Sequence, residues 1–290
     1  MSTETSPFFT VNAVIVTSLF ELDLIKTRFP YFFMVKIPTL EELLQAGAHF
    51  GHKTSKWHPK MKPFIFEERQ GIHIIDLEKT QKALEQALNF AKKTTARGGV
   101  VLFVGTKKQA ASLVSAKASV AEMPYVNKRW LGGILTNFAV INQVIRKYKD
   151  LTRKQEKGEL GKYTKLEQLK FSEQIKKLED NVGGIKNLLK IPEAVFILDI
   201  KKDKTALDEA QRRGVKIMAL CDTNVNPKGV DYVIPCNDDA VKALDLMVTA
   251  MAAACGEGHK EWENNRAKLG VTLKSTATAF NPDLPPAPAK

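Results

Sequence analysis

One basic segment of the chain has an aromatic residue at its centre. It reads KTSKWHPKMKPFIF, and Pro59 and Pro63 exclude a regular helix over it. Cations on an irregular loop suit the phosphates of a nucleic acid, and an aromatic ring suits stacking on an unpaired base. The candidate RNA-binding residues of this segment are Lys53, Lys56, Trp57, Lys60 and Lys62.

A second basic stretch, NKRWLGGILTNF, lies where short apolar runs give way to a long polar segment. Lys128 and Arg129 stand beside Trp130, and the following Gly132-Gly133 lets the backbone pass close to a bulky ligand. All three side chains are candidates for RNA contact. The apolar run after them favours a core position for Trp130 and phosphate contacts for its two basic neighbours.

Lysines also begin a predicted helix in the turn VGTKKQA. Lys107 and Lys108, with the exposed backbone N–H groups of that helix start, suit a single phosphate. The turn has neither the GxGxxG nor the GxxxxGK[ST] spacing of nucleotide-binding loops. Both lysines are therefore further candidates for RNA binding.

Carboxylates at strand ends allow a rival chemistry. Ligands of parallel α/β folds gather at the carboxyl ends of strands, where carboxylates can hold magnesium and a phosphate. The rival is a magnesium-dependent phosphoryl or nucleotide enzyme. Its residues would be Asp199, Asp222 and Asp239, with Thr223 and Lys228 nearby. We favour a simpler interpretation, in which Asp238 caps a helix and the other carboxylates start turns.

Other catalytic patterns are missing from the sequence. Cys221, Cys236 and Cys255 have no CxxC spacing, so we expect reduced core residues of a cytosolic protein. His49 and His52 could share a helical face but have no third close ligand, so no metal site is expected. No Ser/His/Asp or Cys/His set stands out, and we expect no cofactor.

The net charge of +12 is unevenly distributed along the chain. Residues 34–136 carry 16 basic and 8 acidic side chains, residues 137–190 carry 13 and 7, and residues 191–257 carry 8 and 11. An excess of positive charge on two adjoining segments suggests one face turned toward a polyanion.

The spacing of apolar residues predicts an α/β domain over residues 34–136 and 191–257. Thr39 should cap a short first helix, Thr106 should cap a later one, and the last helix should end near Cys255. Between helical stretches lie short apolar runs that read GIHIID, VVLFVG, AVFILD, VKIMAL and YVIP. This alternation predicts a doubly wound parallel sheet covered by helices on both faces.

Residues 137–190 follow a heptad spacing instead. Apolar residues step by three and four from Ile141 to Leu151, and again from Phe171 to Leu189. KGELGKY supplies a turn between the two arms. We expect an inserted antiparallel coiled-coil hairpin that projects from the domain without joining its core, with Gly183-Gly184 bending or ending the second arm.

Both ends of the chain depart from these patterns. Residues 1–33 lack the periodicity found after Met34, and their apolar run is too short to span a bilayer as a helix. We interpret them as a non-native extension from a mistaken start codon. Residues 258–290 are polar and then rich in proline, which predicts a flexible tail.

Several segments together resemble one known family. They are LLQAGAHFGHKTSKWHPKMKPFIFEERQGIHIIDLEKT, VLFVGTKKQA, NKRWLGGILTNF, VGGIKNL, PEAVFILD and CDTNVNPKGVDYVIPCNDDA. From about Val35 to His259 the chain is similar to the bacterial small-subunit ribosomal protein S-two family. The resemblance implies a flavodoxin-like domain with a coiled-coil hairpin, and a structural protein without catalytic activity.

The same resemblance implies a place in the cell and a set of partners. Members of the family are cytoplasmic ribosomal proteins that support translation and bind small-subunit ribosomal RNA between head and body. They join late in assembly and lie beside other small-subunit proteins. In many bacteria they help to dock the multi-OB-fold protein that captures messenger RNA. We therefore expect a structural constituent of the small ribosomal subunit.

Overall fold

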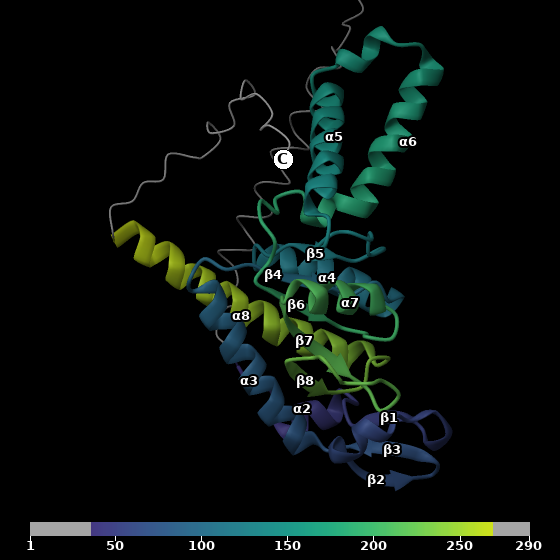
Figure 1. The fold of residues 1–290 in the computed structure, drawn as a ribbon, viewed down its shortest axis with the longest axis vertical. Helices are drawn as coiled ribbons and strands as arrows, with labels where there is room; N and C mark the ends of the chain where they lie inside the picture. Colours follow the sequence, from purple (N-terminus) through teal and green to yellow (C-terminus); the bar gives the residue numbers. More distant parts are fainter. Residues whose placement is uncertain (1–35, 269–290) are drawn as a thin grey trace, which may run out of the picture.

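The computed structural model describes residues 36–268, and its centre is a five-stranded parallel sheet (Figure 1). The strands are β4 (Val101–Val104), β5 (Tyr125–Val126), β6 (Ala194–Ile197), β7 (Lys216–Cys221) and β8 (Tyr232–Pro235). They lie in the order β5-β4-β6-β7-β8, which is the flavodoxin-like order of a doubly wound sheet. The predicted fold class is confirmed.

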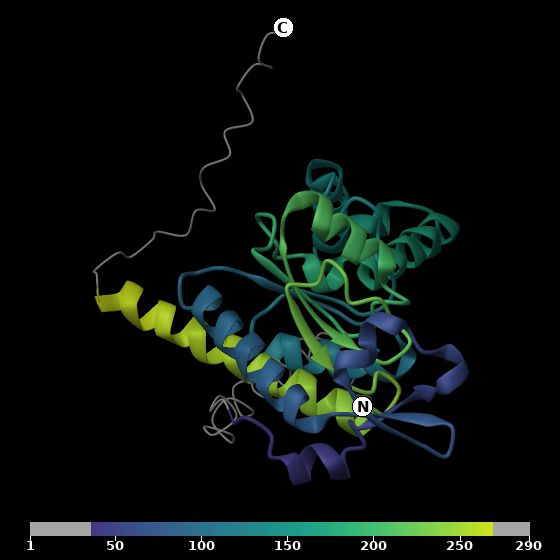
Figure 2. The same cartoon turned by 60° about the horizontal axis from the view of Figure 1, so that its bottom comes forward.

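Each face of this sheet has its own core, because successive side chains of a strand point to opposite faces. On one face Phe103 and Phe196 meet edge to face, with ring centroids 5.6 Å apart. This face is covered by α3 (Leu77–Thr95), α4 (Lys108–Val120) and α8 (Val241–Lys268). The other face packs against α7 (Lys204–Arg213) and the base of the hairpin (Figure 2). Burial on both faces explains why the strands read as continuous apolar runs.

A separate antiparallel sheet precedes the parallel one. After α2 (Leu40–Gln45) come β1 (Phe50–Lys53), β2 (Ile65–Arg69) and β3 (Ile72–Ile75), paired in the order β1-β3-β2. The run GIHIID was expected in the parallel sheet, and that prediction is wrong because the run forms β3. Its side chains alternate between half-buried and buried positions, as in a strand covered on one face.

The two predicted helix caps have different outcomes. Thr39 caps α2 as expected, and Glu42 completes a capping box with it. Thr106 does not cap α4, because Lys107 occupies the cap position. The Thr106 hydroxyl instead donates to Asp203 Oδ1 at 2.8 Å.

A helical hairpin rises from one end of the domain (Figure 1). Its helices, α5 (Phe138–Glu156) and α6 (Lys165–Val182), contact each other and are joined through η5 (Glu159–Lys162). The glycine pair ends α6, as expected, and forms the start of η6 (Gly183–Ile185). A side chain at Gly184 would collide with the backbone of Tyr125, so glycine is required where the hairpin meets β5. That the two helices form a coiled coil stays a prediction.

The base of the hairpin is continuous with the core, contrary to the expectation of a separate seam. Ile141, Val182 and Ile185 are buried in the same cluster as the strands of the adjacent sheet face. At the end of the second arm Leu188 is buried, whereas Leu189 is 84% exposed although the heptad spacing assigned it to the seam.

The last helix is longer than expected. α8 continues past Cys255 to Lys268, so residues 258–268 are helical and do not belong to a flexible tail. Trp262 packs closely against Gly98, after α3, which extends the contact between the two helices. The sequence could not indicate this contact because the partners are far apart along the chain.

Three further expectations concern the rest of the described chain. Cys221, Cys236 and Cys255 are buried and unpaired, as predicted. Among the helices of residues 36–268, none combines the length and apolar character that a membrane span requires. The predictions for residues 1–33 and for the proline-rich end fall outside the described residues.

Candidate nucleic-acid interface

The carboxyl ends of all five parallel strands meet at one edge of the sheet. Loops at this edge commonly bind the ligands of such folds. Lys107 and Lys108 follow β4, and Lys128 and Arg129 follow β5. The fold therefore places two of the three predicted basic sites along one edge.

The third basic site is held at the same edge by backbone contacts. His52 N–H donates to Thr223 Oγ1 at 2.8 Å, and His58 N–H donates to Thr223 O at 2.7 Å. Thr223 follows β7, so the segment of residues 50–64 lies beside the carboxyl end of that strand. All three basic sites thus border the same edge of the sheet.

Within this segment the four predicted lysines are exposed. The 3-10 helices η3 (Thr54–Lys56) and η4 (Pro59–Phe64) turn the chain there, and the fully buried Met61 anchors η4. Trp57 is half-buried, with its ring centroid 5.2 Å from that of His73. No carboxylate of the described residues pairs with any of the exposed lysines, which are Lys53, Lys56, Lys60 and Lys62.

Lys107 has a different environment. Its ammonium lies 2.6 Å from Asp239, 2.9 Å from Asp238 and 3.6 Å from Asp199. Burial lowers the pKa of Lys107, but the carboxylates outweigh burial and raise it. A cation neutralised in this way has little attraction left for a phosphate. The exposed Lys108 is the better placed of the two lysines in this turn.

His52 joins the same cluster of charges. Its Nδ1 lies 3.0 Å from Asp222 Oδ2. The hydrogen bond to Asp222 raises the pKa of His52 against the opposing effect of burial. Burial and the neighbouring carboxylates of Asp222 and Asp199 raise the pKa of Asp238 to about 6. Ligand atoms of His52, Asp222 and Asp238 lie within 4.8 Å of one another, so their geometry could accommodate a cation.

The expected helix cap at Asp238 needs correction. Its carboxylate accepts a hydrogen bond from Lys107 at 2.9 Å. In the turn before α8 it is Asn237 Oδ1 that accepts the backbone N–H groups of Asp239 and Ala240, at 2.8 and 3.2 Å. Asp199, Asp238 and Asp239 are therefore brought together around Lys107 and do not merely begin turns.

Side chains bridge the point where a nucleotide would bind in a flavodoxin-like fold. That point lies between β4 and β6, where the strand order reverses. Thr106 Oγ1 donates to Asp203 at 2.8 Å, and Lys202 Nζ donates to Thr106 O at 2.8 Å. The loops after the two strands are thus tied to each other, which weighs against the rival interpretation as an enzyme.

The stretch after β5 separates into exposed cations and a buried ring. Lys128 and Arg129 are exposed, and the Lys128 ammonium lies 3.9 Å from Asp180 of α6. Trp130 is 8% exposed and belongs to the core cluster, as the apolar run after it indicated. Its ring is therefore not available for stacking on a base, whereas its two neighbours can reach a phosphate.

Glu209 of α7 fixes this stretch, although it was not among the predicted functional residues. The side chain is 5% exposed. Its carboxylate accepts hydrogen bonds from Trp130 Nε1 at 3.1 Å and from the backbone N–H groups of Gly133, Leu135 and Thr136 at 2.7, 3.1 and 3.2 Å. Burial raises the pKa of Glu209, but these bonds outweigh it and lower the pKa, so the group is a buried anion.

The position of Glu209 on its helix is a sequence signal that could have indicated a buried, hydrogen-bonded carboxylate. Glu209 lies three residues after Ala206 and one before Ala210, both fully buried, so it stands on the covered side of α7. A charged residue on an apolar helix face requires partners. The sequence does not name those partners, because they lie more than 70 residues earlier in the chain.

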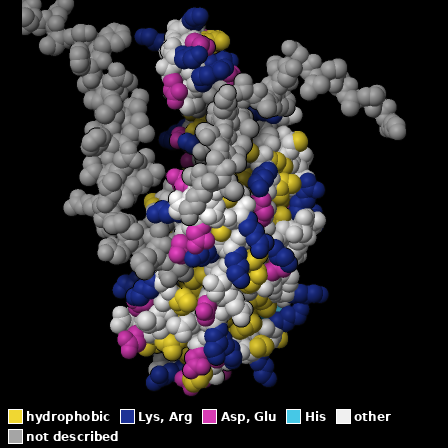
Figure 3. All heavy atoms as spheres, turned by 90° about the vertical axis from the view of Figure 1, so that its left-hand side faces the viewer, with side chains coloured by type: hydrophobic (Ala, Val, Ile, Leu, Met, Phe, Trp, Pro, Cys, Tyr) yellow, Lys and Arg dark blue, Asp and Glu magenta, His cyan; other side chains and the backbone are white. Residues whose placement is uncertain are grey.

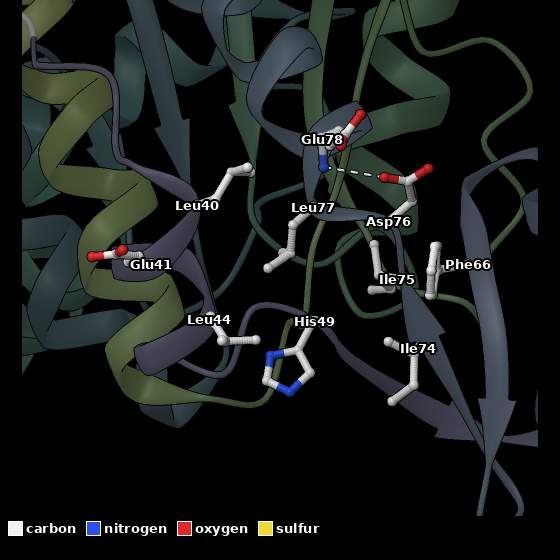
Figure 4. A pocket seen from close by; sticks show the side chains of 10 residues that line it. All are labelled: Leu40, Glu41, Leu44, His49, Phe66, Ile74, Ile75, Asp76, Leu77 and Glu78. Atoms are coloured by element: carbon white, nitrogen blue, oxygen red, sulfur yellow. Dashed lines mark hydrogen bonds between the residues drawn. The ribbon is translucent and has the colours of Figure 1, made fainter.

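A hollow of about 440 Å³ lies between α2 and the small sheet (Figure 4). Leu40 and Leu44 of α2 line one side, and Phe66 and Ile74 line the other. This apolar lining does not suit a polyanion. On the face drawn in Figure 3, basic, acidic and hydrophobic side chains are intermixed and form no single basic patch.

Comparisons with a family model and with individual proteins indicate the same family. The family model described as ribosomal protein S2 matches residues 43–258. Small ribosomal subunit protein uS2 of Chloroflexus aggregans is 46% identical over 231 residues, which cover 80% of this chain and 97% of that protein. The protein of the same name from Mycobacterium leprae is 46% identical over 222 residues, covering 77% and 80%. That of Acidothermus cellulolyticus is 44% identical over 255 residues, covering 88% and 89%.

Proposed function

Because this chain belongs to the ribosomal protein S2 family, we propose that it is a structural constituent of the small ribosomal subunit and binds its ribosomal RNA. The relatives are ribosomal proteins and not enzymes. The magnesium-dependent enzyme built on Asp199, Asp222 and Asp239 therefore has no support. The contact surface in this proposal is the carboxyl edge of the parallel sheet with the basic segment beside it.

The observation that carries this proposal is a set of exposed cations without carboxylate partners among the described residues. On the segment beside β7 these are Lys53, Lys56, Lys60 and Lys62, and after β4 and β5 they are Lys108 and Arg129. Their charge is free to neutralise phosphates, and each neutralised phosphate releases counterions. Lys107, whose charge is already balanced by carboxylates, contributes to holding the edge together.

The position in the subunit and the remaining partners are part of the same proposal. We place the chain between head and body, in the cytoplasmic ribosome. The hairpin projects beyond the sheet and so has the reach to contact a neighbouring RNA helix or small-subunit protein. The multi-OB-fold protein that captures messenger RNA is a further partner where it occurs.

The test compares two double variants in binding to a small-subunit ribosomal RNA transcript. Lys53→Gln with Lys56→Gln removes two cations of the proposed surface. Lys93→Gln with Arg97→Gln removes two exposed, unpaired cations, one in the last turn of α3 and one just after that helix. If both lysines of the first pair contact phosphates, the slope of log affinity against log salt should fall by about 1.4–1.8.

The α3 control variant should keep the salt slope of the unchanged chain. Thermal melting of both variants should stay within roughly 0.5 kcal/mol of the unchanged chain, because exposed unpaired charges add little stability. Binding of the unchanged chain that is insensitive to salt, or no co-sedimentation with small subunits, would overturn the proposed function.

A further inference from the structure

A second hollow of the surface combines an apolar lining with positive charge. It has a volume of about 840 Å³ and lies between η4 and the loop that precedes β8. Phe64, Pro63 and Pro227 contribute to its apolar lining, and Lys60, Lys62 and Lys228 supply its charge. We call it the η4 groove. Its volume falls within the range of about 300–1,000 Å³ that is usual for small-molecule sites.

The charge of this groove is uncompensated among the described residues. No carboxylate lines it, and none of the described carboxylates pairs with Lys60, Lys62 or Lys228. Lys228 was expected near the carboxylates of the rival enzyme, but Asp199 and Asp239 contact Lys107 instead, and Asp222 pairs with His52. A groove with cations and no anion is electrostatically complementary to a phosphate.

Both walls of the η4 groove are held in place by hydrogen bonds. On one wall Lys228 N–H donates to Asn226 Oδ1 at 3.1 Å, and Val230 N–H donates to Pro227 O at 3.2 Å. Gly229 sits between them with φ +85°, a conformation that favours glycine. On the other wall Lys79 Nζ donates to Pro63 O at 2.8 Å. Walls that are already ordered lose little entropy when a ligand binds.

We propose that the η4 groove binds one unpaired nucleotide of RNA, with its phosphate at the lysines and its base against the proline and phenylalanine lining. This inference rests on the proposed function and assigns it a specific subsite. A paired duplex offers phosphates but keeps its bases stacked, and an acidic peptide offers charge without a flat ring. Of these three ligands, only the unpaired nucleotide uses both the cations and the apolar surface.

The experiment measures binding of the full chain to four probes at several salt concentrations. They are a uridylate dodecamer, an abasic ribose-phosphate dodecamer, a blunt RNA duplex of the same length, and a glutamate dodecapeptide. The uridylate strand should bind most tightly. The abasic strand should bind at least about fivefold more weakly, because each base held by an apolar or aromatic surface adds to affinity.

The variant Lys228→Gln isolates the groove. It should weaken uridylate binding and lower its salt slope by about 0.7, the value for one phosphate contact on a single strand. Lys93→Gln, at an exposed and unpaired lysine in the last turn of α3, is the matched control and should bind like the unchanged chain. Melting curves verify that both variants are folded.

Two results would overturn the η4 groove as a nucleotide site. One is uridylate binding that Lys228→Gln leaves unchanged in affinity and salt slope. The other is an abasic strand or a glutamate peptide that binds as tightly as uridylate. If the unchanged chain still binds ribosomal RNA in a salt-dependent way, the proposed function survives either result. If it does not bind ribosomal RNA at all, the proposed function itself fails.

Discussion

Replacing Glu209 should lower the free energy of unfolding, because its carboxylate is buried and accepts several hydrogen bonds. The Glu209→Ala substitution removes a buried carboxylate that accepts hydrogen bonds from Trp130 Nε1 and from the backbone of Gly133, Leu135 and Thr136. Trp130 and Leu135 are buried, so water cannot easily replace the lost acceptor for their N–H groups. Gly133 and Thr136 are more accessible and can turn to water.

The magnitude follows from those two buried donors. Leaving a buried donor without a partner costs about 1–3 kcal/mol, so the two together should reduce the free energy of unfolding by about 2–6 kcal/mol. For a domain of this size, each kcal/mol lowers the melting temperature by about 2–4 °C. The Ala variant should therefore melt at least about 4 °C below the unchanged chain.

The assay is urea unfolding at pH 7 with three variants. Glu209→Gln keeps one acceptor oxygen but turns an NH2 group toward other donors, so its stability should lie between that of the Ala variant and the unchanged chain. Asp208→Ala, on the same helix and without a hydrogen bond or ion pair in the described structure, should stay within about 0.5 kcal/mol. The reasoning is refuted if Glu209→Ala is no less stable than Asp208→Ala.

The remaining predictions concern the hairpin and the charge cluster. Replacing residues 147–176 by a short glycine linker should leave the sheet folded, because the buried base at Val182 and Ile185 is retained, while incorporation into small subunits should fall. Loss of a cooperative melting transition would contradict this. Melting temperature should also fall as pH rises from about 5.5 to 8, because the folded-state pKa values of Asp238 and His52 are raised and their stabilisation is lost as pH passes through them. His52→Asn should flatten the upper part of this profile, and an unchanged profile above pH 6.5 would exclude His52 as its cause.

Elements that depend on neighbours in the chain were predictable. The continuous apolar runs of β4, β6 and β7 indicate strands buried on both faces, and the Thr39 capping box is visible as T-x-x-E. β3 was misassigned because a short, mostly apolar run reads the same in a parallel or an antiparallel sheet. The antiparallel pairing of β3 with β1 and β2, which requires the structure, separates the two cases.

Contacts between distant parts of the chain were not predictable. Lys107 and Lys108 are equivalent in the sequence, yet only Lys107 meets carboxylates, and those come from the loop before α8 and the end of β6. The same limit hid Glu209, whose partners lie on another loop. For Trp130 the apolar run beside it was a local signal, and its core position was therefore foreseen.

The contacts between loops at the carboxyl edge of the parallel sheet indicate where a ligand is expected to bind and where it is not. In a flavodoxin-like sheet the switch point between β4 and β6 is the natural ligand crevice. Here Thr106 and Asp203 tie its two loops together, and carboxylates balance the charge of Lys107 beside them. Positive charge without a partner lies farther out, on the segment beside β7 and at Lys228. Because the two loops are tied together, the crevice is less suited to enclosing a small nucleotide. The unpaired cations farther out are better suited to a long polyanion that runs along the edge of the sheet.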